Sequence, residues 1–395
     1  MKTQPTHKCK VLHIITRLII GGAQENTLIT LRGLNSTGSY ETGLLCGQTL
    51  GPEGSLEDEA RNITDFKVLP QLVRNINPVI DLIALVRIYL FIKKGGYHIV
   101  HTHSSKAGIL GRCAAKLAGV PLIIHTIHGL PFFKHQNPVL NNLYIMLERF
   151  AAAFTDKIIC VSGTLIDNAV SAKIAPTAKF IRIFSGINLE KYTADGHEKD
   201  AFKKKLGIGE NQPVVGTIAR LFYQKGHRYL IDAAVRVAKK IPGVKFLFVG
   251  DGILKEKLQK EVFRLNLGKN VIFAGLITPD LVPRYLEVMD VLAHASLHEG
   301  LPRAVVQAQL LGVPSVCFDI DGARDIVKHG SSGYLVKPQD SADLADRIIE
   351  LLTDKNKSRE FGRNGQRLAR ENFGAKKMVD DINALYQNLI SRCGI

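Results

Sequence analysis

The sequence has few of the features that mark disulfide-rich, metal-binding, membrane-spanning or nucleic-acid-binding proteins. Its six cysteines lie far apart and form no Cys-x-x-Cys pair, which favours reduced thiols in the cytoplasm over a disulfide framework or a zinc site. The longest apolar run, residues 78–92, carries Asp81 and Arg87 and falls short of a membrane span. No run of Lys and Arg exceeds residues 203–205, and aromatic residues are not interleaved with the basic ones, so we expect no nucleic-acid partner.

Negative charge is also scarce. There are 36 acidic against 52 basic residues, which gives a net charge of +16 and a pI near 9.5. This excess implies an anionic partner, either phosphorylated small molecules or an anionic lipid surface. A helix is predicted over residues 77–94 with Arg74, Lys93 and Lys94 on or beside it. It is either a domain helix with a solvated basic edge or a helix that binds an anionic membrane surface.

What is present is a repeated alternation of buried strands and amphipathic helices. A strand over residues 10–16, the turn Gly21-Gly22 and a helix over residues 24–34 begin a doubly wound α/β unit. The same alternation restarts with a strand over residues 213–219. Because 395 residues are too many for one core, two domains are expected. The fold class is therefore α/β, with two Rossmann-like domains facing across a cleft.

The domain boundaries follow from a polar, glycine-containing stretch in the middle of the chain. Residues 1–190 are predicted to form the N-terminal domain, completed by a closing helix over residues 376–395. Residues 191–212 are predicted to be the linker. Residues 213–375 are then the C-terminal domain.

Polar side chains follow two strands of the first half. His101, His103, Ser104 and Ser105 lie at the end of a strand over residues 98–102, and His128 follows the strand over residues 121–126. In open α/β sheets, ligands bind outside the carboxyl ends of strands. His103 and His128 are possible metal ligands, but no nearby carboxylate completes a set. We favour a neutral histidine that hydrogen-bonds a substrate hydroxyl or carbonyl.

A second set of candidates lies in the second half. Arg220 and Lys225 follow its first strand, and such a pair suits a pyrophosphate. Glu299 stands before Gly300 and Leu301 at the start of a helix, where free N–H groups suit phosphate and a carboxylate suits hydroxyls. The alternatives are two solvated basic residues and a helix start that binds no ligand.

Four motifs in order resemble glycosyltransferase family four. They are Gly21-Gly22, the loop His125-Thr126-Ile127-His128-Gly129, Gly216-x-x-x-Arg220-x-x-x-x-Lys225-Gly226, and Glu299-Gly300-Leu301-Pro302. The resemblance spans residues 10–372 and implies a retaining, metal-independent hexosyltransferase of the GT-B fold. It implies a nucleotide diphosphate sugar as donor, a UDP-sugar first, and a saccharide or polyprenyl-linked glycan as acceptor, in the synthesis of surface polysaccharide. No cofactor is implied, and the expected location is the cytoplasm, with peripheral contact at the inner membrane face.

The resemblance also implies roles for individual residues. Arg220 and Lys225 would neutralise the donor diphosphate, and Glu299 would hold hydroxyls of the donor sugar beside the N–H groups of Gly300 and Leu301. His128 would approach the reacting carbon of the transferred sugar. The acceptor and phosphate loop would comprise Gly21, Gly22 and His103, so the resemblance makes the N-terminal domain the acceptor side and the C-terminal domain the donor side.

Two positions differ from the family pattern, and one short sequence matches a metal signature of other enzymes. The family has a second glutamate eight residues after the first, where it binds ribose, but this chain has Gln307, which accepts hydrogen bonds without charge. Asp325 stands where the family commonly has glutamate. Asp319 and Asp321 spell an Asp-x-Asp metal signature, which we interpret as a loop. Two further functions stay open: a nucleotide-sugar 2-epimerase of the same fold, and a non-catalytic nucleotide-sugar-binding subunit.

Overall fold

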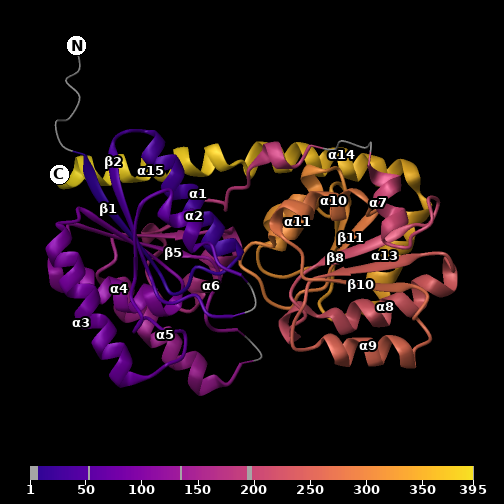
Figure 1. Ribbon diagram of the computed structural model, residues 1–395, viewed down its shortest axis with the longest axis horizontal. Helices are drawn as coiled ribbons and strands as arrows, with labels where there is room; N and C mark the ends of the chain where they lie inside the picture. The colour runs from indigo at the N-terminus through magenta and orange to yellow at the C-terminus, as the bar shows by residue number, and fades with distance from the viewer. Residues whose placement is uncertain (1–7, 52–53, 134–135, 194–197, 395) are drawn as a thin grey trace, which may run out of the picture. The chain divides into compact units, whose positions relative to one another are not determined.

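A computed structural model describes residues 8–51, 54–133, 136–193 and 198–394. The chain divides into two compact units. Unit 1 comprises Met1–Gly186 and Ala375–Ile395, and unit 2 comprises Ile187–Gly374 (Figure 1). Each unit has a parallel sheet flanked by helices, so the predicted α/β class is confirmed.

Unit 1 is built on a seven-stranded sheet in the order β3-β2-β1-β4-β5-β6-β7. Every pair of neighbouring strands is parallel, as expected where helices connect successive strands. The strands are β1 (Cys9–Ile15), β2 (Tyr40–Cys46), β3 (Asp65–Val68), β4 (Ile99–His103), β5 (Leu122–Ile127), β6 (Lys157–Cys160) and β7 (Phe180–Arg182).

Helices cover both faces of this sheet. One face packs against α3 and α4 through a core that includes Ile88 and Ala114, and the other packs against α15 through Met378 and Leu385. The terminal helix thus belongs to the domain that begins the chain (Figure 1). The helices are α1 (Gly22–Ser36), α2 (Glu57–Arg61), α3 (Pro78–Gly95), α4 (Ser105–Ala118), α5 (Pro138–Ala153), α6 (Gly163–Ser171), α15 (Ala375–Cys393) and the short 3₁₀ helix η1 (Thr177–Lys179).

Local chemistry explains the bounds of α3. The side chain of Asn77 accepts hydrogen bonds from the N–H groups of Val79 and Ile80, and Pro78 occupies the first turn, where no N–H is needed. The helix ends at Gly96, whose φ of 62° is in the left-handed region that glycine adopts without strain.

Unit 2 is built on a six-stranded parallel sheet in the order β10-β9-β8-β11-β12-β13. Its strands are β8 (Val214–Ile218), β9 (Lys245–Val249), β10 (Val271–Gly275), β11 (Val291–His294), β12 (Ser315–Phe318) and β13 (Gly333–Val336). Its helices are α7 (Lys199–Lys205), α8 (His227–Lys240), α9 (Lys255–Arg264), α10 (Val282–Glu287), α11 (Arg303–Leu310), α12 (Ala323–Ile326), α13 (Ser341–Thr353) and α14 (Lys355–Asn372), with 3₁₀ helices η2 (Leu189–Lys191), η3 (Tyr223–Lys225) and η4 (Pro279–Leu281).

The stretch predicted as a linker, residues 191–212, falls inside unit 2. Residues 194–197 of it lie outside the described residues, but the rest contains α7. Lys203 of this helix is buried, and its Nζ donates to the carbonyls of Glu210 and Gln212. Charged composition indicated a solvated segment here, whereas the buried lysine finds its acceptors within the same stretch.

In each sheet, the order in which strands are added reverses at one point. In unit 1 the chain runs outward from β1 to β3 and then returns to place β4 beside β1. In unit 2 it runs from β8 to β10 and returns to place β11 beside β8. The carboxyl ends of such strand pairs leave a crevice where ligands bind in this architecture. We therefore expect ligand sites at the residues that follow β1 and β4 and at those that follow β8 and β11.

Candidate functional site

The crevice of unit 2 holds a compact group that we call the Lys225–Glu299 cluster: Lys225, His294, Ser296 and Glu299. The close approach of the two loops that carry this cluster depends on a glycine. Gly226 has a φ of 63°, and a Cβ atom there would lie 1.9 Å from the carbonyl oxygen of Ala295. The loop after β8 therefore packs directly on the end of β11, and the N–H of Leu297 donates to the carbonyl of Gln224 at 2.7 Å. This contact brings Lys225 to Glu299.

Glu299 is the centre of the cluster. Its Oε1 forms an ion pair with Lys225, accepts from Ser296 Oγ at 2.8 Å and lies 3.2 Å from His294 Nε2. Burial alone would raise the pKa of Glu299, but the charge of Lys225 and the contact with His294 lower it well below its ordinary value. Glu299 is therefore ionised at neutral pH, with one oxygen already engaged by three donors.

Two aspartates after β12 have structural partners. Asp321 Oδ2 accepts from the N–H of Glu299 at 2.9 Å and lies 3.0 Å from His298 Nδ1. Asp319 receives two bonds from the guanidinium of Arg324, at 2.5 and 3.0 Å. The Asp-x-Asp sequence is thus a loop, as interpreted from the sequence, and it positions the backbone of Glu299.

The remaining candidates of unit 2 lie in loops and helix starts of the same unit. Arg220 follows β8, and its guanidinium lies 5.1 Å from the ring centre of Phe222. Gly300 and Leu301 precede α11, which begins at Arg303. Asp325 lies in the short helix α12.

Gln307 has a defined orientation on α11. Its Nε2 donates to the hydroxyl of Tyr192 at 2.7 Å, so its Oε1 is presented as an acceptor. The neighbouring Gln309 is fully buried, and its Nε2 donates to the carbonyl of Ile326. Of these two amides, only Gln307 is partly accessible.

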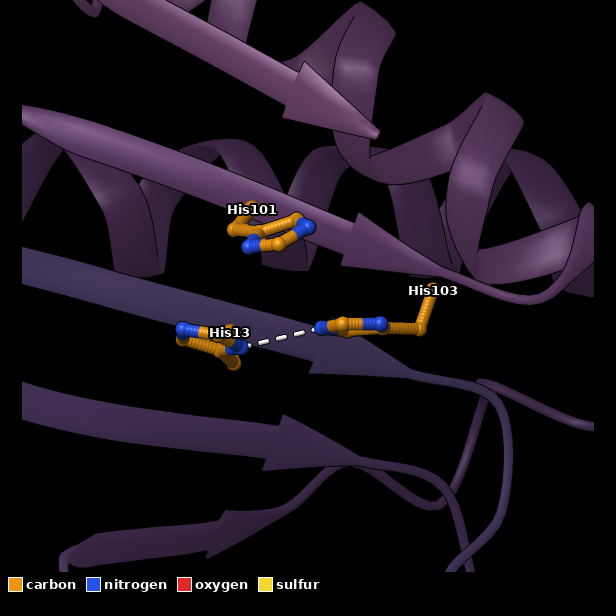
Figure 2. A group of neighbouring side chains, drawn as sticks. All are labelled: His13, His101 and His103. Atoms are coloured by element: carbon orange, nitrogen blue, oxygen red, sulfur yellow. Dashed lines mark hydrogen bonds between the residues drawn. The ribbon is translucent and has the colours of Figure 1, made fainter. Parts of the chain in front are cut away.

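The crevice of unit 1 holds a different group, which we call the histidine cluster: His13, His101, His103, His128 and Tyr386. Side chains alternate along a strand, so His101 and His103 of β4 point to the same face of the sheet, beside His13 of β1 (Figure 2). Tyr386 reaches the same face from α15, where its hydroxyl lies 2.6 Å from His101 Nδ1.

These rings are linked to one another. His13 Nδ1 lies 2.9 Å from His103 Nε2, and His103 Nδ1 lies 3.0 Å from His128 Nε2 (Figure 2 shows the first contact). Burial lowers the pKa of His13 to about 3 and the pKa values of His101 and His103 well below the ordinary value. The three buried rings of His13, His101 and His103 are therefore neutral at physiological pH.

The residues predicted for the acceptor loop are His103, which is buried, and the two glycines at the start of α1. His103 is 1% exposed, and both of its ring nitrogens contact other histidines. A direct contact between His103 and an acceptor would require one of these bonds to break. Gly21 directly precedes α1 with a φ of −179°, which any residue adopts, and Gly22 is the first helical residue.

Among the described residues, one group of three or more His, Cys, Asp or Glu side chains has metal-ligand spacing: His13, His101 and His103, with ligating atoms within 4.8 Å of one another. Their geometry does not suit a metal. The ring of His101 stacks on that of His103, with centroids 4.4 Å apart and planes at 29°, so its in-plane lone pairs do not converge with those of His103. Its nitrogens are also engaged by Tyr386 and Thr126.

Several of these residues were not identified from the sequence. His294 and Ser296 hold Glu299, and Tyr386 joins the histidine cluster from the other end of the chain. Asp321 was named only as part of the Asp-x-Asp sequence, and its bond to the N–H of Glu299 was not predicted. A signal existed for His294 and Ser296, because both lie at the carboxyl end of a buried strand. No local signal marks Tyr386.

Comparison with known proteins agrees with this arrangement. The family described as "Glycosyltransferase Family 4" matches residues 20–191, and that described as "Glycosyl transferases group 1" matches residues 198–368. A UDP-Gal:alpha-D-GlcNAc-diphosphoundecaprenol alpha-1,3-galactosyltransferase of Escherichia coli is 31% identical over 389 residues, 98% of each chain. The capsular polysaccharide biosynthesis glycosyltransferase CapM of Staphylococcus aureus is 25% identical over 328 residues, 82% of this chain and 85% of CapM.

Solved structures show the same fold. HepE of Anabaena, determined in complex with UDP and glucose, has a TM-score of 0.83 at 23% identity and covers 96% of this chain and 100% of its own. The sucrose-phosphate synthase of Thermosynechococcus elongatus has a TM-score of 0.84 at 20% identity and covers 98% of this chain and 100% of its own. The expected GT-B fold is confirmed.

Proposed function

Because the chain belongs to glycosyltransferase family four, whose sugar-transfer reaction its relatives share, we propose that it moves a hexose from a UDP-sugar to a saccharide carried on a lipid diphosphate, with retention of configuration and without a metal or other cofactor. Galactose is the first choice, from the E. coli relative that matches nearly the whole chain. The observation that carries the proposal is the Lys225–Glu299 cluster. It combines an ionised carboxylate with a fixed cation at the carboxyl ends of β8 and β11.

The chemistry assigned to this cluster is electrostatic. Loss of the nucleotide diphosphate generates negative charge on the leaving oxygen, and fixed positive groups placed there lower the barrier most. Arg220 and Lys225 supply this charge. Glu299 accepts hydrogen bonds from hydroxyls of the donor sugar, and its charge makes these bonds about twice as strong as neutral ones. The backbone N–H groups of Gly300 and Leu301 complete the donor site.

Lys225 has two alternative partners in this scheme. Without donor, its ammonium pairs with Glu299 in a partly buried setting, 19% exposed for the lysine side chain and 14% for the glutamate. A diphosphate carries more negative charge than one carboxylate, so donor binding draws Lys225 toward the phosphates. Glu299 is thereby released to accept from sugar hydroxyls.

Gln307 is assigned to the ribose. The bond to Tyr192 fixes the amide so that its carbonyl oxygen is the accepting group. A neutral acceptor suffices for a hydroxyl, and such a bond contributes about 1 kcal/mol. This assignment keeps Gln307 in the donor site and opposes a loss of activity at this position.

His128 is assigned to the transferred sugar, and Gly21 and Gly22 to the acceptor loop. In these roles His128 is a neutral hydrogen-bonding group rather than a cation. The residue it contacts in the histidine cluster, His103, is itself held neutral by burial.

The test is a donor and acceptor screen. Purified enzyme is incubated with UDP-galactose, UDP-glucose, UDP-N-acetylglucosamine or GDP-mannose, with and without an N-acetylglucosaminyl diphosphate lipid. We expect transfer from UDP-galactose that requires acceptor, and an α-anomeric product by NMR. Conversion of donor in the absence of acceptor would establish the epimerase instead. Donor binding without turnover on any acceptor would establish the binding subunit.

The lipid portion of such an acceptor requires contact with a membrane, and unit 1 has a surface suited to it. No helix among the described residues is long and apolar enough to cross a bilayer. Helices α3 and α5, which both contact α4, nevertheless expose apolar side chains along one stripe each. We call these residues the apolar stripes: Val79, Leu82, Ile83, Val86 and Leu90 of α3, and Val139, Leu143, Met146 and Phe150 of α5.

Charge identifies the partner of this surface. Helices α3, α4 and α5 contain seven Lys and Arg residues but two acidic ones, Asp81 and Glu148. Both acids are neutralised within unit 1, by Lys106 and Arg112. An apolar helix face with basic residues and no unpaired acid suits the headgroup region of an anionic bilayer. We therefore propose that the apolar stripes contact anionic lipid.

Vesicle flotation tests this contact. We expect the protein to bind vesicles that contain phosphatidylglycerol and to leave them at high salt, since screening weakens the attraction. Phe150→Glu on α5 should reduce binding several-fold. Phe263→Glu on α9 of unit 2 is the matched control, because it makes the same change at an 83% exposed phenylalanine. Equal binding of the two variants would refute the assignment.

A further inference from the structure

The histidine cluster forms one continuous hydrogen-bonded chain. From the crevice inward it runs from His128 Nε2 to His103 Nδ1, from His103 Nε2 to His13 Nδ1, and from His13 Nε2 to the hydroxyl of Tyr386. From Tyr386 it continues to His101 Nδ1, and from His101 Nε2 to Thr126 Oγ1. We infer that Tyr386 fixes the tautomer of His128 through this chain and is thereby a positioning residue for sugar transfer. The catalytic consequence rests on the proposed function, whereas the tautomer itself does not.

Each link constrains the next. A neutral imidazole has one protonated nitrogen, which donates, and one bare nitrogen, which accepts. If His103 donates from Nε2, its Nδ1 must accept, and the reverse also holds. The low pKa values of the three buried rings exclude a doubly protonated member that would interrupt the chain. The chain therefore has two possible directions, and the single proton of the Tyr386 hydroxyl selects between them.

The distances select one direction. The Tyr386 oxygen lies 2.6 Å from His101 Nδ1 and 3.4 Å from His13 Nε2. Hydroxyl donors form shorter hydrogen bonds than N–H donors, which lie mostly between about 2.7 and 3.2 Å. The hydroxyl proton therefore points to His101. Two bare atoms would repel each other at the longer contact, so His13 Nε2 carries a proton and donates to the Tyr386 oxygen.

The rest of the chain follows from that choice. His13 Nδ1 is bare and accepts from His103 Nε2. His103 Nδ1 is then bare and accepts from His128 Nε2. His128 consequently carries a proton on Nε2, which it donates to His103. His101, bare at Nδ1, donates from Nε2 to Thr126. All four histidines share the Nε2–H tautomer.

Removal of the Tyr386 hydroxyl should release this constraint. In Tyr386→Phe the buried Nε2–H of His13 has no acceptor, and an unpaired buried donor is unfavourable. Reversal of the chain relieves it, because His13 then donates from Nδ1 to His103, and His103 donates from Nδ1 to His128. His128 would become bare at Nε2 and protonated at Nδ1, which changes the hydrogen bonds that this ring can form in the proposed reaction.

The control is a second buried tyrosine on the same face of unit 1. Tyr40 is 4% exposed, its hydroxyl donates to Asn383 on α15 at 2.7 Å, and its ring packs edge-on against Tyr386. Tyr40→Phe therefore removes a comparable hydroxyl and a comparable contact with α15. It leaves the hydrogen-bonded chain intact.

Histidine tautomers are read directly from long-range ¹H–¹⁵N spectra of protein labelled at histidine, with His128→Asn, His103→Asn and His13→Asn used to assign the rings. We expect the Nε2–H pattern at all four cluster histidines in the unaltered protein and in Tyr40→Phe. Tyr386→Phe should convert His128, His103 and His13 wholly or partly to the Nδ1–H pattern. Unchanged spectra in Tyr386→Phe, or an Nδ1–H pattern for His128 in the unaltered protein, would overturn the inference. Ring shifts on addition of Zn²⁺ that mark ligation would also overturn it.

Kinetics then test the consequence for transfer. Tyr386→Phe should lower kcat roughly tenfold or more with little change in KM for the donor, because the altered contact is made in the transition state. Tyr40→Phe should lower it less than about twofold, the experimental margin for a variant that removes no such contact. If the tautomers change while kcat does not, the role proposed for His128 fails but the coupling stands. If kcat falls equally in both variants, Tyr386 is structural.

Discussion

The two units place polar groups at the same position in the same topology, yet they do so with opposite electrostatics. Unit 1 surrounds the switch point between β1 and β4 with neutral imidazoles, held neutral by burial. Unit 2 surrounds the switch point between β8 and β11 with an ionised carboxylate and a lysine. A buried polar group must be either uncharged and hydrogen-bonded or charged and paired, and the two switch points differ in which of these solutions they use.

The difference separates two tasks in the proposed reaction. Charge develops on the leaving diphosphate, so charged residues belong with the donor, where fixed positive groups have the largest effect. The sugar presents hydroxyls, which neutral acceptors can orient without a counterion. The Lys225–Glu299 cluster and the histidine cluster are therefore not interchangeable, and acid, charge removal and charge addition should affect them differently.

Mild acid should break the comparison most strongly, because it protonates the histidines of the unfolded chain while the buried rings of the folded cluster stay neutral. Burial lowers the pKa of His13 to about 3 from an ordinary 6.5, and it also lowers the pKa values of His101, His103 and His125. Below pH 6.5 the unfolded chain binds protons that the folded unit does not. The free energy of unfolding is therefore highest above pH 6.5 and falls toward pH 3, and His13 alone accounts for a loss of about 2 kcal/mol at pH 5.

Unit 2 serves as the internal control for this prediction. Among the described residues of unit 2, His227 has a clearly lowered pKa, at about 4. The low pKa of Glu299 removes stability only as the pH falls below the ordinary carboxyl value of 4.5. Hydrogen exchange with mass spectrometry between pH 7 and 5, corrected for intrinsic rates, should show unit 1 losing protection first. Equal losses in both units would contradict the neutral state of the histidine cluster.

Removal of the Lys225 cation should have the second largest effect. Lys225→Ala should lower kcat/KM by roughly 100- to 1000-fold, the usual cost of losing a group that stabilises transition-state charge. The same change raises the pKa of Glu299, since burial then acts without a cation. Lys255→Ala is the control, because Lys255 pairs with Asp251 on the surface of the same unit. Near-normal activity of a folded Lys225→Ala protein would refute the assignment.

Addition of a charge at Gln307 should have a smaller effect. Gln307→Glu strengthens an acceptor to ribose and should tighten donor binding a few-fold, by about 1 kcal/mol, with kcat nearly unchanged. The hydroxyl of Tyr192 can donate to the new carboxylate, so the contact survives. Gln309→Glu instead introduces a charge at a fully buried position and should lower the melting temperature. Calorimetric titration of UDP-galactose that finds unchanged affinity in Gln307→Glu would exclude contact with the ribose.

Chelation should have the smallest effect. Asp319 is bound by Arg324, and Asp321 by the N–H of Glu299 and by His298. These carboxylates are therefore engaged before any ion arrives. Saturating EDTA should leave most of the transferase activity intact. Loss of activity with rescue by Mn²⁺ would instead make Asp319 and Asp321 ligands.

The sequence predicted the fold because the fold depends on local patterns. Apolar runs bounded by glycine and proline located nearly every strand, and the order of strands and helices indicated two doubly wound sheets. It did not reveal short helices such as α6 or the packing of Lys203, because these depend on partners met only after folding. The buried lysine in particular contradicts what its charged neighbours indicate.

The candidate sites divide in the same way. Arg220, Lys225 and Glu299 were predicted because each follows a strand within a few residues, and the structure pairs Lys225 with Glu299. The bond of Asp321 to the backbone of Glu299 and the contact of Tyr386 with the histidine cluster were not predicted. Tyr386 lies 285 residues from His101 in the sequence, and no spacing rule links positions so far apart. Residues that follow strands could thus be named from the sequence, whereas the groups that orient them could not.

The return of α15 to unit 1 has a consequence for synthesis of the protein on the ribosome. One face of the first sheet is covered by Met378, Ile382 and Leu389, which are translated only after all of unit 2. At about 5 to 20 residues per second, unit 2 takes roughly 10 to 40 s to emerge. During that time unit 1 carries an uncovered apolar face, and His101 lacks its hydroxyl partner. Unit 2 is therefore translated second but is the first unit that can complete its fold. A chain released before residue 375 would contain a complete unit 2 attached to an incomplete unit 1.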